Sequence, residues 1–344
     1  MVYIVFFIVL FLFACVHERW DNLLFKIASF ALLVLVCLRS QTIGIDTTYG
    51  YRYYFQYIQE GLNVFWIEPL WIFINKLSIW FGLGYQGVLI FAGLLTLIPV
   101  YYVITKTCSN KRFALAIYYG LYLCLFSFNL MRQSVALSFV LLATYLYIAK
   151  KYRIALLSFI VAVMFHSSAF LALPLILFFK LNLDFPKIIL LFIVTYFLGI
   201  FLNDQFFFTI TGSYSKNLLA SDGYTGFRSS IVIPAIFCFI FNVFFIIVLF
   251  PEYNKLKNDP WLLMVILGVL VMNMTMRLGQ GTRVVLFFSQ AQAIFIPNYI
   301  RKFEKERDKI IICFLYSAFL GANFFRMLIS SWNEVCPYSF FWLK

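Results

Sequence analysis

Charged side chains at the ends of apolar segments are the residues of this sequence that are best suited to chemistry. Four arginines hold such positions: Arg39, Arg132, Arg277 and Arg283. An Arg inside a membrane costs about 2.5 to 3.5 kcal/mol unless it reaches water or a partner. A lone Arg of this kind is more often a side chain that snorkels to the headgroups, but several on one membrane face favour an anionic ligand. Because the planar guanidinium fork suits phosphate oxygens, we expect these residues to bind a diphosphate.

Three residues are candidates for proton transfer. His166 lies in the segment VMFHSSAFLALP and is one of two histidines in the chain. Its imidazole could accept a proton or hydrogen-bond a sugar, and the competing interpretation is a histidine that caps or packs against a kinked helix. Asp46 and Glu68 are carboxylates near membrane depth, where a charge needs a partner. For these two, a salt bridge with one of the arginines is slightly favoured over the role of catalytic base.

Aromatic side chains make up 21% of the chain, and five tyrosines gather in one segment, at positions 49, 51, 53, 54 and 57. Tyrosine and tryptophan are enriched where a membrane meets water, so we interpret this group as part of an interfacial belt. The alternative is that a few of these rings stack on sugars. The seven cysteines form no CxxC pair and lie mostly in apolar runs, so neither a disulfide framework nor a metal site is expected.

The source of energy for any reaction must also be considered. The sequence contains no GxxxxGK[ST], HExxH or GxSxG motif. We therefore expect the substrate itself to supply the energy, without a cofactor. A lipid diphosphate is an activated leaving group, so the protein need only bind it, orient an acceptor hydroxyl and remove a proton.

The elements that must position these residues are membrane helices. The chain has 344 residues, of which 64% are hydrophobic and 12% charged. Its apolar runs are continuous and about 13 to 22 residues long, whereas barrel strands alternate apolar and polar residues. The sequence therefore predicts an all-α polytopic protein with about 12 to 13 transmembrane segments and one integral membrane domain over residues 1–344. The expected spans are roughly 2–16, 23–38, 66–81, 86–105, 113–128, 131–149, 153–166, 168–180, 187–202, 229–250, 261–277, 283–300 and 309–329.

The first apolar run is expected to be a retained helix and not a signal peptide, because no basic residue precedes it and no small-residue cleavage site follows it. Two longer polar connections, 39–64 and 203–228, separate the other runs and are rich in Tyr, Gly, Asp and Thr. Long loops of this kind are usually functional.

Basic residues predict the orientation of the chain, because cytoplasmic loops carry the excess of Lys and Arg. They collect around positions 106–112, 150–153, 180–187, 255–257 and 301–309, which we assign to the cytoplasm. The net charge of +13 is then explained by topology and anionic lipid, without nucleic acid. Alternating spans place Arg132, His166, the connection 203–228 and the turn from Arg277 to Arg283 on the outer face.

One difficulty concerns the connection after Arg39. If the runs 66–81 and 86–105 both cross the membrane, this connection falls on the cytoplasmic side. One of these runs, or a short segment flanking His166, could instead be a half-span that lines a polar cavity. We prefer the outer side for Arg39.

The ordered set of polar residues resembles the EpsG family, which groups with the Wzy-type polymerases of O-antigen, capsule and exopolysaccharide. The residues that carry the resemblance run through nearly the whole chain: Arg39 with Gly44, Asp46 and Tyr49, then Glu68-Pro69, Arg132-Gln133, the basic loop 150–153 followed by His166-Ser167-Ser168-Ala169, then Arg283, and finally Asn333 with Pro337-Tyr338. The resemblance implies a fold related to the GT-C membrane glycosyltransferases. It also implies transfer of a growing glycan from undecaprenyl diphosphate to an incoming lipid-linked repeat unit, without nucleotide sugar or a required metal.

These expectations combine into one hypothesis of mechanism. Arg132, Arg277 and Arg283 hold the donor diphosphate, and His166 or one of the two carboxylates deprotonates the acceptor. Arg39 orients that carboxylate or binds the phosphate of the second lipid. The family resemblance adds Gln133 and Tyr338 as further substrate contacts.

The expected location is the bacterial cytoplasmic membrane, with the site facing the periplasm or cell exterior. The expected partners are the lipid-linked oligosaccharide, membrane lipids, and a chain-length regulator and flippase of the same pathway. The alternatives are a flippase or other transporter, a membrane acyltransferase and an O-antigen ligase. Polar groups at one membrane face, and the lack of matching halves, favour the polymerase over a transporter.

Overall fold

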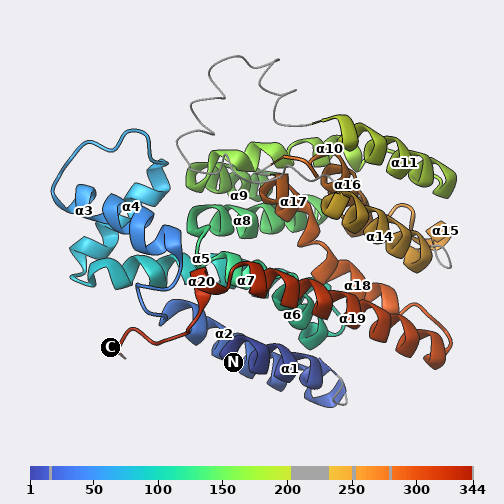
Figure 1. The fold of residues 1–344 in the computed structure, drawn as a ribbon, viewed down its shortest axis with the longest axis horizontal. Coiled ribbons are helices and arrows are strands. Elements are labelled where there is room, and N and C mark those ends of the chain that lie inside the picture. The colour runs from blue at the N-terminus through green and yellow to red at the C-terminus, as the bar shows by residue number, and fades with distance from the viewer. Residues whose placement is uncertain (15–17, 203–231, 250–252, 279–280, 343–344) are drawn as a thin grey trace. The chain divides into compact units, whose positions relative to one another are not determined.

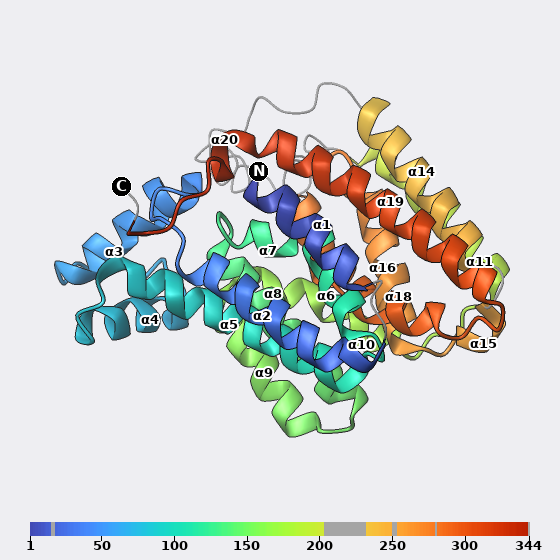
Figure 2. The ribbon, with the colours of Figure 1, turned by 90° about the horizontal axis from the view of Figure 1, so that it is seen from below.

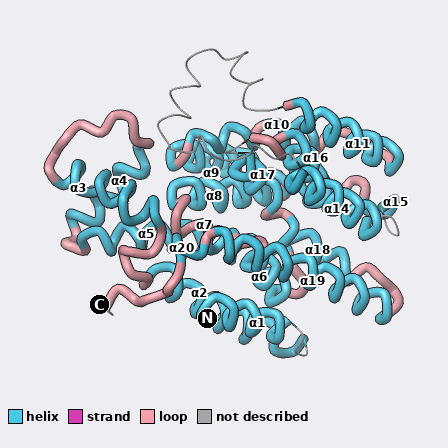
Figure 3. The backbone as a smooth tube through the Cα atoms, in the orientation of Figure 1, coloured by secondary structure: helices cyan, strands magenta, loops and turns pink. Residues whose placement is uncertain are grey.

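The computed structural model describes residues 1–14, 18–202, 232–249, 253–278 and 281–342. Within these ranges the chain is helical and contains no strand, as Figure 3 shows, apart from an isolated antiparallel bridge between Arg39 and Phe340. The prediction of an all-α fold is confirmed. The predicted connection 203–228 lies outside the described residues, so nothing tests it.

Backbone contacts group the chain into two compact units. The first unit consists of Met1–Phe170 and Gln292–Lys344, and the second consists of Leu171–Ala291. The main helices of the first unit are α1 (Val2–Ala14), α2 (Asp21–Cys37), α5 (Gly84–Thr107), α6 (Lys111–Gly120), α8 (Met131–Ile148), α9 (Tyr152–Phe165), α18 (Gln292–Ile300) and α19 (Glu306–Ser330).

Helix α8 is central to the packing of the first unit. It lies alongside α5 and α9 in both views (Figure 1, Figure 2), and most of its side chains are buried. The outer face of α9 carries exposed aliphatic residues such as Leu156, Leu157 and Ile160. Aliphatic side chains on the outside and packed helices inside are the pattern of a protein whose solvent is lipid.

The number of transmembrane segments is not confirmed. Among the described residues, three helices are long and apolar enough to cross a membrane: Gly84–Thr107, Met131–Ile148 and Glu306–Ser330. Several expected spans are broken into shorter pieces. The run 113–128 forms α6 and α7 (Leu123–Phe126), because Tyr122 adopts a left-handed conformation with φ of 66° between them. The runs 168–180 and 283–300 are also divided, into η3 (Ser167–Ala172) with α10 (Pro174–Phe178), and α17 (Gly281–Ser289) with α18, but without a left-handed residue at the break.

The predicted polar connection 39–64 contains two helices, η2 (Asp46–Tyr51) and α3 (Arg52–Gln59). Thr47, Tyr51, Phe55 and Ile58 recur every three or four residues along it and are buried. This helical period is hidden in the sequence by the many polar residues between them. Helix α4 (Pro69–Trp80) follows, with Pro69 in the first helical position, where its missing N–H costs nothing.

The turn between α4 and α5 carries a glycine pattern that could be mistaken for a nucleotide-binding motif. The segment 82–87 reads GLGYQG and fits GxGxxG. That pattern indicates a dinucleotide site only where it follows a strand and opens a helix. Here a helix precedes it, and Gly82 and Gly84 serve a tight turn, with φ of 66° and 58°. The pattern therefore indicates no nucleotide site.

The second unit contains α10, α11 (Phe185–Phe201), α14 (Val232–Leu249), α15 (Tyr253–Leu256), α16 (Pro260–Met274) and α17. A buried amide cluster joins three of these helices. Asn242 Nδ2 donates to Asn273 Oδ1 over 3.1 Å, and Asn273 Nδ2 lies 3.2 Å from Thr195 Oγ1. Gly199 lets α11 approach α16 so closely that a Cβ there would collide with the carbonyl of Asn273. Small residues and interhelical hydrogen bonds are what hold apolar helices together in lipid.

The C-terminal segment of the first unit closes over the residues that follow α2. Ser40 N donates to Ser339 O over 2.9 Å, and Phe341 N donates to Leu38 O over 3.0 Å. Just before this, α20 (Trp332–Val335) brings Glu334 O to within 2.7 Å of Gly44 N. Chain segments about 300 residues apart therefore meet beside the start of η2.

We expect Gly44→Ala to destabilise the protein by about 2 kcal/mol or more, because Gly44 has a φ of 98° and a Cβ there would collide with the carbonyl of Phe128. The measurement is thermal unfolding of the purified protein in detergent. Gly50→Ala is the matched control, because nothing lies within 4 Å of its Cβ position. Equal melting temperatures for the two variants would contradict the prediction.

Candidate active site

Three of the polar residues singled out in the sequence meet in the first unit. Glu68 precedes the first residue of α4, Arg132 is the second residue of α8, and His166 follows the last residue of α9. Arg132 NH1 donates to Glu68 Oε2, and His166 Nδ1 lies 3.0 Å from Glu68 Oε1. The salt bridge that the sequence predicts for Glu68 is confirmed, and its partner is Arg132. We call these three residues the Glu68 cluster.

The Glu68 cluster is half-buried, with the side chains of Glu68, Arg132 and His166 exposed by 17%, 20% and 23%. Burial raises the pKa of Glu68, but the hydrogen bond to His166 and the charge of Arg132 outweigh it. The result is a pKa of about 2, below the ordinary value of 4.5. Glu68 is therefore ionised at neutral pH and is a weak proton acceptor. Its geometry instead fits the orientation of the other two side chains.

Glu68→Gln should lower the free energy of unfolding by about 2 kcal/mol, because it leaves the Arg132 charge without its counter-ion. A depressed carboxyl pKa contributes stability that is fully present above the unfolded value of 4.5 and is lost as pH falls through about 2. The stability gap between wild type and variant should therefore not shrink as the pH falls from 8 to about 5.5. Thermal unfolding in detergent at several pH values measures this gap. A gap that closes by pH 5.5 would refute the assignment of Glu68 as a strongly acidic group.

His166 owes its position to the end of α9. Its backbone turns to the extended conformation, with φ of −159°, while its N–H still donates to Ala162 O over 3.0 Å. Because Glu68 is ionised, the hydrogen-bond network assigns the imidazole proton to Nδ1. In the neutral imidazole with its proton on Nδ1, Nε2 carries the lone pair that can accept a proton. A histidine that ends a helix and one that transfers a proton are thus compatible here.

Arg132 is held from a second side by tyrosine rings. Its guanidinium carbon lies 5.6 Å from the ring centroids of both Tyr51 and Tyr54. Tyr51 in turn packs on Trp71 of α4, with ring centroids 5.0 Å apart. Among the described residues, the Arg132 Nε–H has no hydrogen-bond partner. The guanidinium is therefore fixed in orientation.

The roles of Tyr51 and Tyr54 were not found from the sequence. A spacing of three residues places both on one face of a helix, which was the available signal. Because the segment was predicted to be a polar connection, this helical spacing gave no reason to place the two tyrosines together.

Arg39 lies in the interior of the first unit and is 1% exposed. Its NH1 donates to Val36 O over 2.8 Å, its NH2 lies 3.4 Å from Ser127 O, and its guanidinium lies over the ring of Phe128. These contacts indicate a structural role in holding the loop before α8. They do not favour the predicted contact with substrate.

Gln133 and Tyr338, the other two predicted substrate contacts, are held in place by the protein itself. Gln133 is 2% exposed. Tyr338 donates its hydroxyl to Leu35 O over 3.0 Å and packs edge-on against Tyr3. For both residues, binding to a substrate stays a prediction that this geometry does not favour.

Asp46 begins η2, close to the loop that leads into α8. Its backbone N lies 3.4 Å from Asn129 Oδ1, and Asn129 Nδ2 donates to Glu334 Oε2. Through Asn129, the C-terminal segment therefore braces the loop that ends two residues before Arg132. The structure joins Asp46 to this brace, and its role as a catalytic base stays a prediction.

Arg277 and Arg283 belong to the second unit. Arg277 NH1 donates over 2.6 Å to Ile200 O, a carbonyl at the C-terminal end of α11, where a cation interacts favourably with the helix dipole. Arg283 is half-buried in α17. Their expected convergence with Arg132 involves residues of different units and stays a prediction.

Comparison with known proteins gives one match. The model of the EpsG family matches residues 22–340, a range that includes every candidate residue discussed above. No curated protein and no solved structure matches the chain.

Proposed function

Because the chain belongs to the EpsG family, a family of Wzy-type polymerases, we propose that it joins lipid-linked oligosaccharide units into a polysaccharide. The growing glycan leaves undecaprenyl diphosphate and is transferred to a sugar of the next lipid-linked unit. Its apolar helices and aliphatic outer faces make the chain a membrane protein. The proposed location is the bacterial cytoplasmic membrane, with the reaction on its outer face.

One observation carries the proposal: a single carboxylate orients both a cation and a base. Glu68 holds Arg132 with one oxygen and His166 with the other. A glycosyl transfer from a diphosphate needs a donor for the departing phosphate oxygens and an acceptor for the hydroxyl proton. The Glu68 cluster provides both on one fixed support.

The proposed reaction is a displacement at the anomeric carbon of the donor. The acceptor hydroxyl forms a bond to that carbon while its proton passes to His166 Nε2. The bond from the same carbon to the diphosphate oxygen breaks, and undecaprenyl diphosphate leaves with the electron pair. Arg132 donates to the diphosphate as its charge grows, and His166 then releases the proton to solvent.

A diphosphate carries more charge than Arg132 alone can balance, since Glu68 already neutralises part of that guanidinium. Other cations must supply the rest, and that role for Arg277 and Arg283 stays a prediction from the sequence. The chain-length regulator and flippase of the same pathway are the proposed protein partners.

The other candidate functions differ in what they consume and release. A flippase moves the lipid-linked unit without extending it, and a membrane acyltransferase requires an acyl donor. An O-antigen ligase uses the same donor but a different acceptor. The family match favours polymerisation over all three.

The test is reconstitution of the purified chain in liposomes with a defined undecaprenyl-diphosphate-linked repeat unit. We expect a ladder of longer lipid-linked glycans and one undecaprenyl diphosphate released for each unit added. Translocation without a ladder, a requirement for an acyl donor, or transfer only to a different acceptor would each overturn the proposal.

A further inference from the structure

Helix α3 presents a face of exposed tyrosines that the proposed mechanism does not use. Tyr49, Tyr53 and Tyr57 are exposed by 65%, 52% and 39%. Residues four apart lie on the same side of a helix, so the three rings share one face of η2 and α3. The buried side chains of Tyr51, Phe55 and Ile58 occupy the other side.

The other exposed residues of this segment are polar. Arg52, Gln56, Gln59 and Glu60 are exposed, and no aliphatic side chain is exposed between positions 49 and 60. The outer face of α9 differs, because its exposed residues include leucine and isoleucine. A surface facing lipid would resemble α9, so the composition of the α3 face favours contact with a hydrated ligand.

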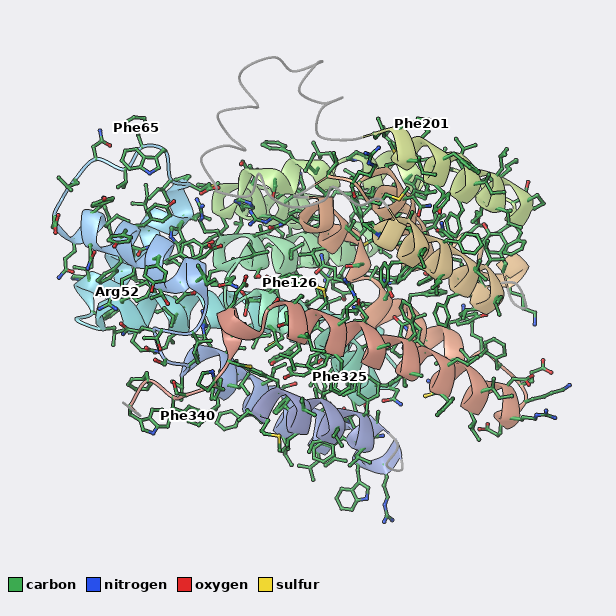
Figure 4. The ribbon with its side chains drawn as sticks, viewed as in Figure 1. Arg52, Phe65, Phe126, Phe201, Phe325 and Phe340 are labelled. Carbon is green, nitrogen blue, oxygen red and sulfur yellow. The ribbon has the colours of Figure 1, made fainter. Side chains whose placement is uncertain are left out.

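The same short segment reaches the candidate active site. Tyr51 and Tyr54 contact Arg132, while Tyr49, Tyr53 and Tyr57 face outward one helix width away. Figure 4 labels Arg52 among the blue and cyan helices at the left of the view. A ligand with its charged group at Arg132 and a long polar remainder would find this face within reach.

We infer that the exposed face of α3 binds the glycan of the lipid-linked substrate. Each tyrosine offers a rigid ring that covers the apolar face of a sugar and a hydroxyl that hydrogen-bonds at its edge. Gln56 and Arg52 supply further donors for sugar hydroxyls. This inference rests on the proposed function, because it takes the glycan to be part of the substrate.

The experiment uses the full chain in detergent and two probes. The first probe is the lipid-linked repeat unit, scored for the rate of polymerisation. The second is the repeat-unit oligosaccharide without lipid or phosphate, scored for binding by saturation-transfer NMR. The test variant is Tyr53→Ala with Tyr57→Ala, and Tyr53→Phe with Tyr57→Phe retains the rings. Tyr152→Ala removes an equally exposed tyrosine at the start of α9.

We expect the double alanine variant to raise KM for the lipid-linked unit at least about tenfold with little change in kcat, and to lose the oligosaccharide signal. The double phenylalanine variant, which loses two hydroxyls but keeps the rings, should raise KM less than the double alanine variant does. Tyr152→Ala should stay within about twofold of wild type. Wild-type behaviour of the alanine variant in both assays would overturn the inference. A fall in polymerisation that is fully accounted for by a lower amount of membrane-inserted protein, with KM and oligosaccharide binding unchanged, would overturn it too. Oligosaccharide binding by a wild type that makes no polymer would instead refute the proposed function and leave this site standing.

Discussion

Arg132→Ala is expected to reduce polymerisation by about 10³-fold, because it removes the donor that stabilises the departing diphosphate. The rate is measured with the lipid-linked repeat unit in liposomes, at equal levels of folded protein. Arg132→Lys keeps the charge but not the planar fork, so its loss should be smaller, about 10-fold to 100-fold. The difference between the two variants reports how much of the effect depends on the geometry of the guanidinium.

Arg153→Ala is the matched control for Arg132→Ala, because it removes an exposed cation near the start of α9. It should leave the rate unchanged. A wild-type glycan ladder from Arg132→Ala would remove Arg132 from the mechanism and reduce its pair with Glu68 to a structural contact.

His166→Ala is expected to lower kcat by about 10² to 10⁴-fold while KM changes little, since general-base catalysis contributes on that scale and His166 is not proposed to bind the diphosphate. His166→Gln separates catalysis from structure. Its amide can still hydrogen-bond Glu68 but cannot take a proton at neutral pH. We expect this variant to fold like wild type and to be nearly inactive.

Polymer of normal length from either His166 variant, at preserved protein levels, would contradict this role. A variant that loses activity only by failing to fold would be recognised by its melting temperature. The His166→Gln result decides between loss of catalysis and loss of folding, because the glutamine amide is expected to replace the hydrogen bond that His166 makes to Glu68.

The fold class and the centre of the site could be predicted from the sequence, for physical reasons that concern particular residues. Continuous apolar runs indicate membrane helices, and the structure is helical in its described parts. The cost of a charge at membrane depth marked Glu68 and Arg132 as needing partners, and they are each other's partner.

The same argument could not separate a ligand site from a structural contact. The guanidinium of Arg39 donates to the carbonyls of Val36 and Ser127. These contacts offset the cost of an arginine at membrane depth, so no substrate is needed to explain its position. Arg277 is satisfied in a similar way by Ile200 O at the end of α11. Only coordinates distinguish a backbone carbonyl from a phosphate as the partner of an arginine.

Local backbone conformation was the other feature that could not be predicted. The left-handed residue at Tyr122 breaks an apolar run that the hydropathy pattern shows as one span. The helix α3 was hidden because its exposed side is polar and only one residue in three or four is buried. The sequence therefore favoured an aromatic belt at the membrane–water interface for its tyrosines, and the structure adds that two of them contact Arg132.

The most direct measurement is the site of photochemical labelling by a lipid-linked repeat unit that carries a diazirine on its first sugar, next to the diphosphate. We predict labelled peptides that contain Arg132 or His166, displacement of the label by excess undecaprenyl diphosphate, and loss of the label in Arg132→Ala. Label confined to segments without these residues, and unchanged in Arg132→Ala, would show that the substrate does not bind at the Glu68 cluster.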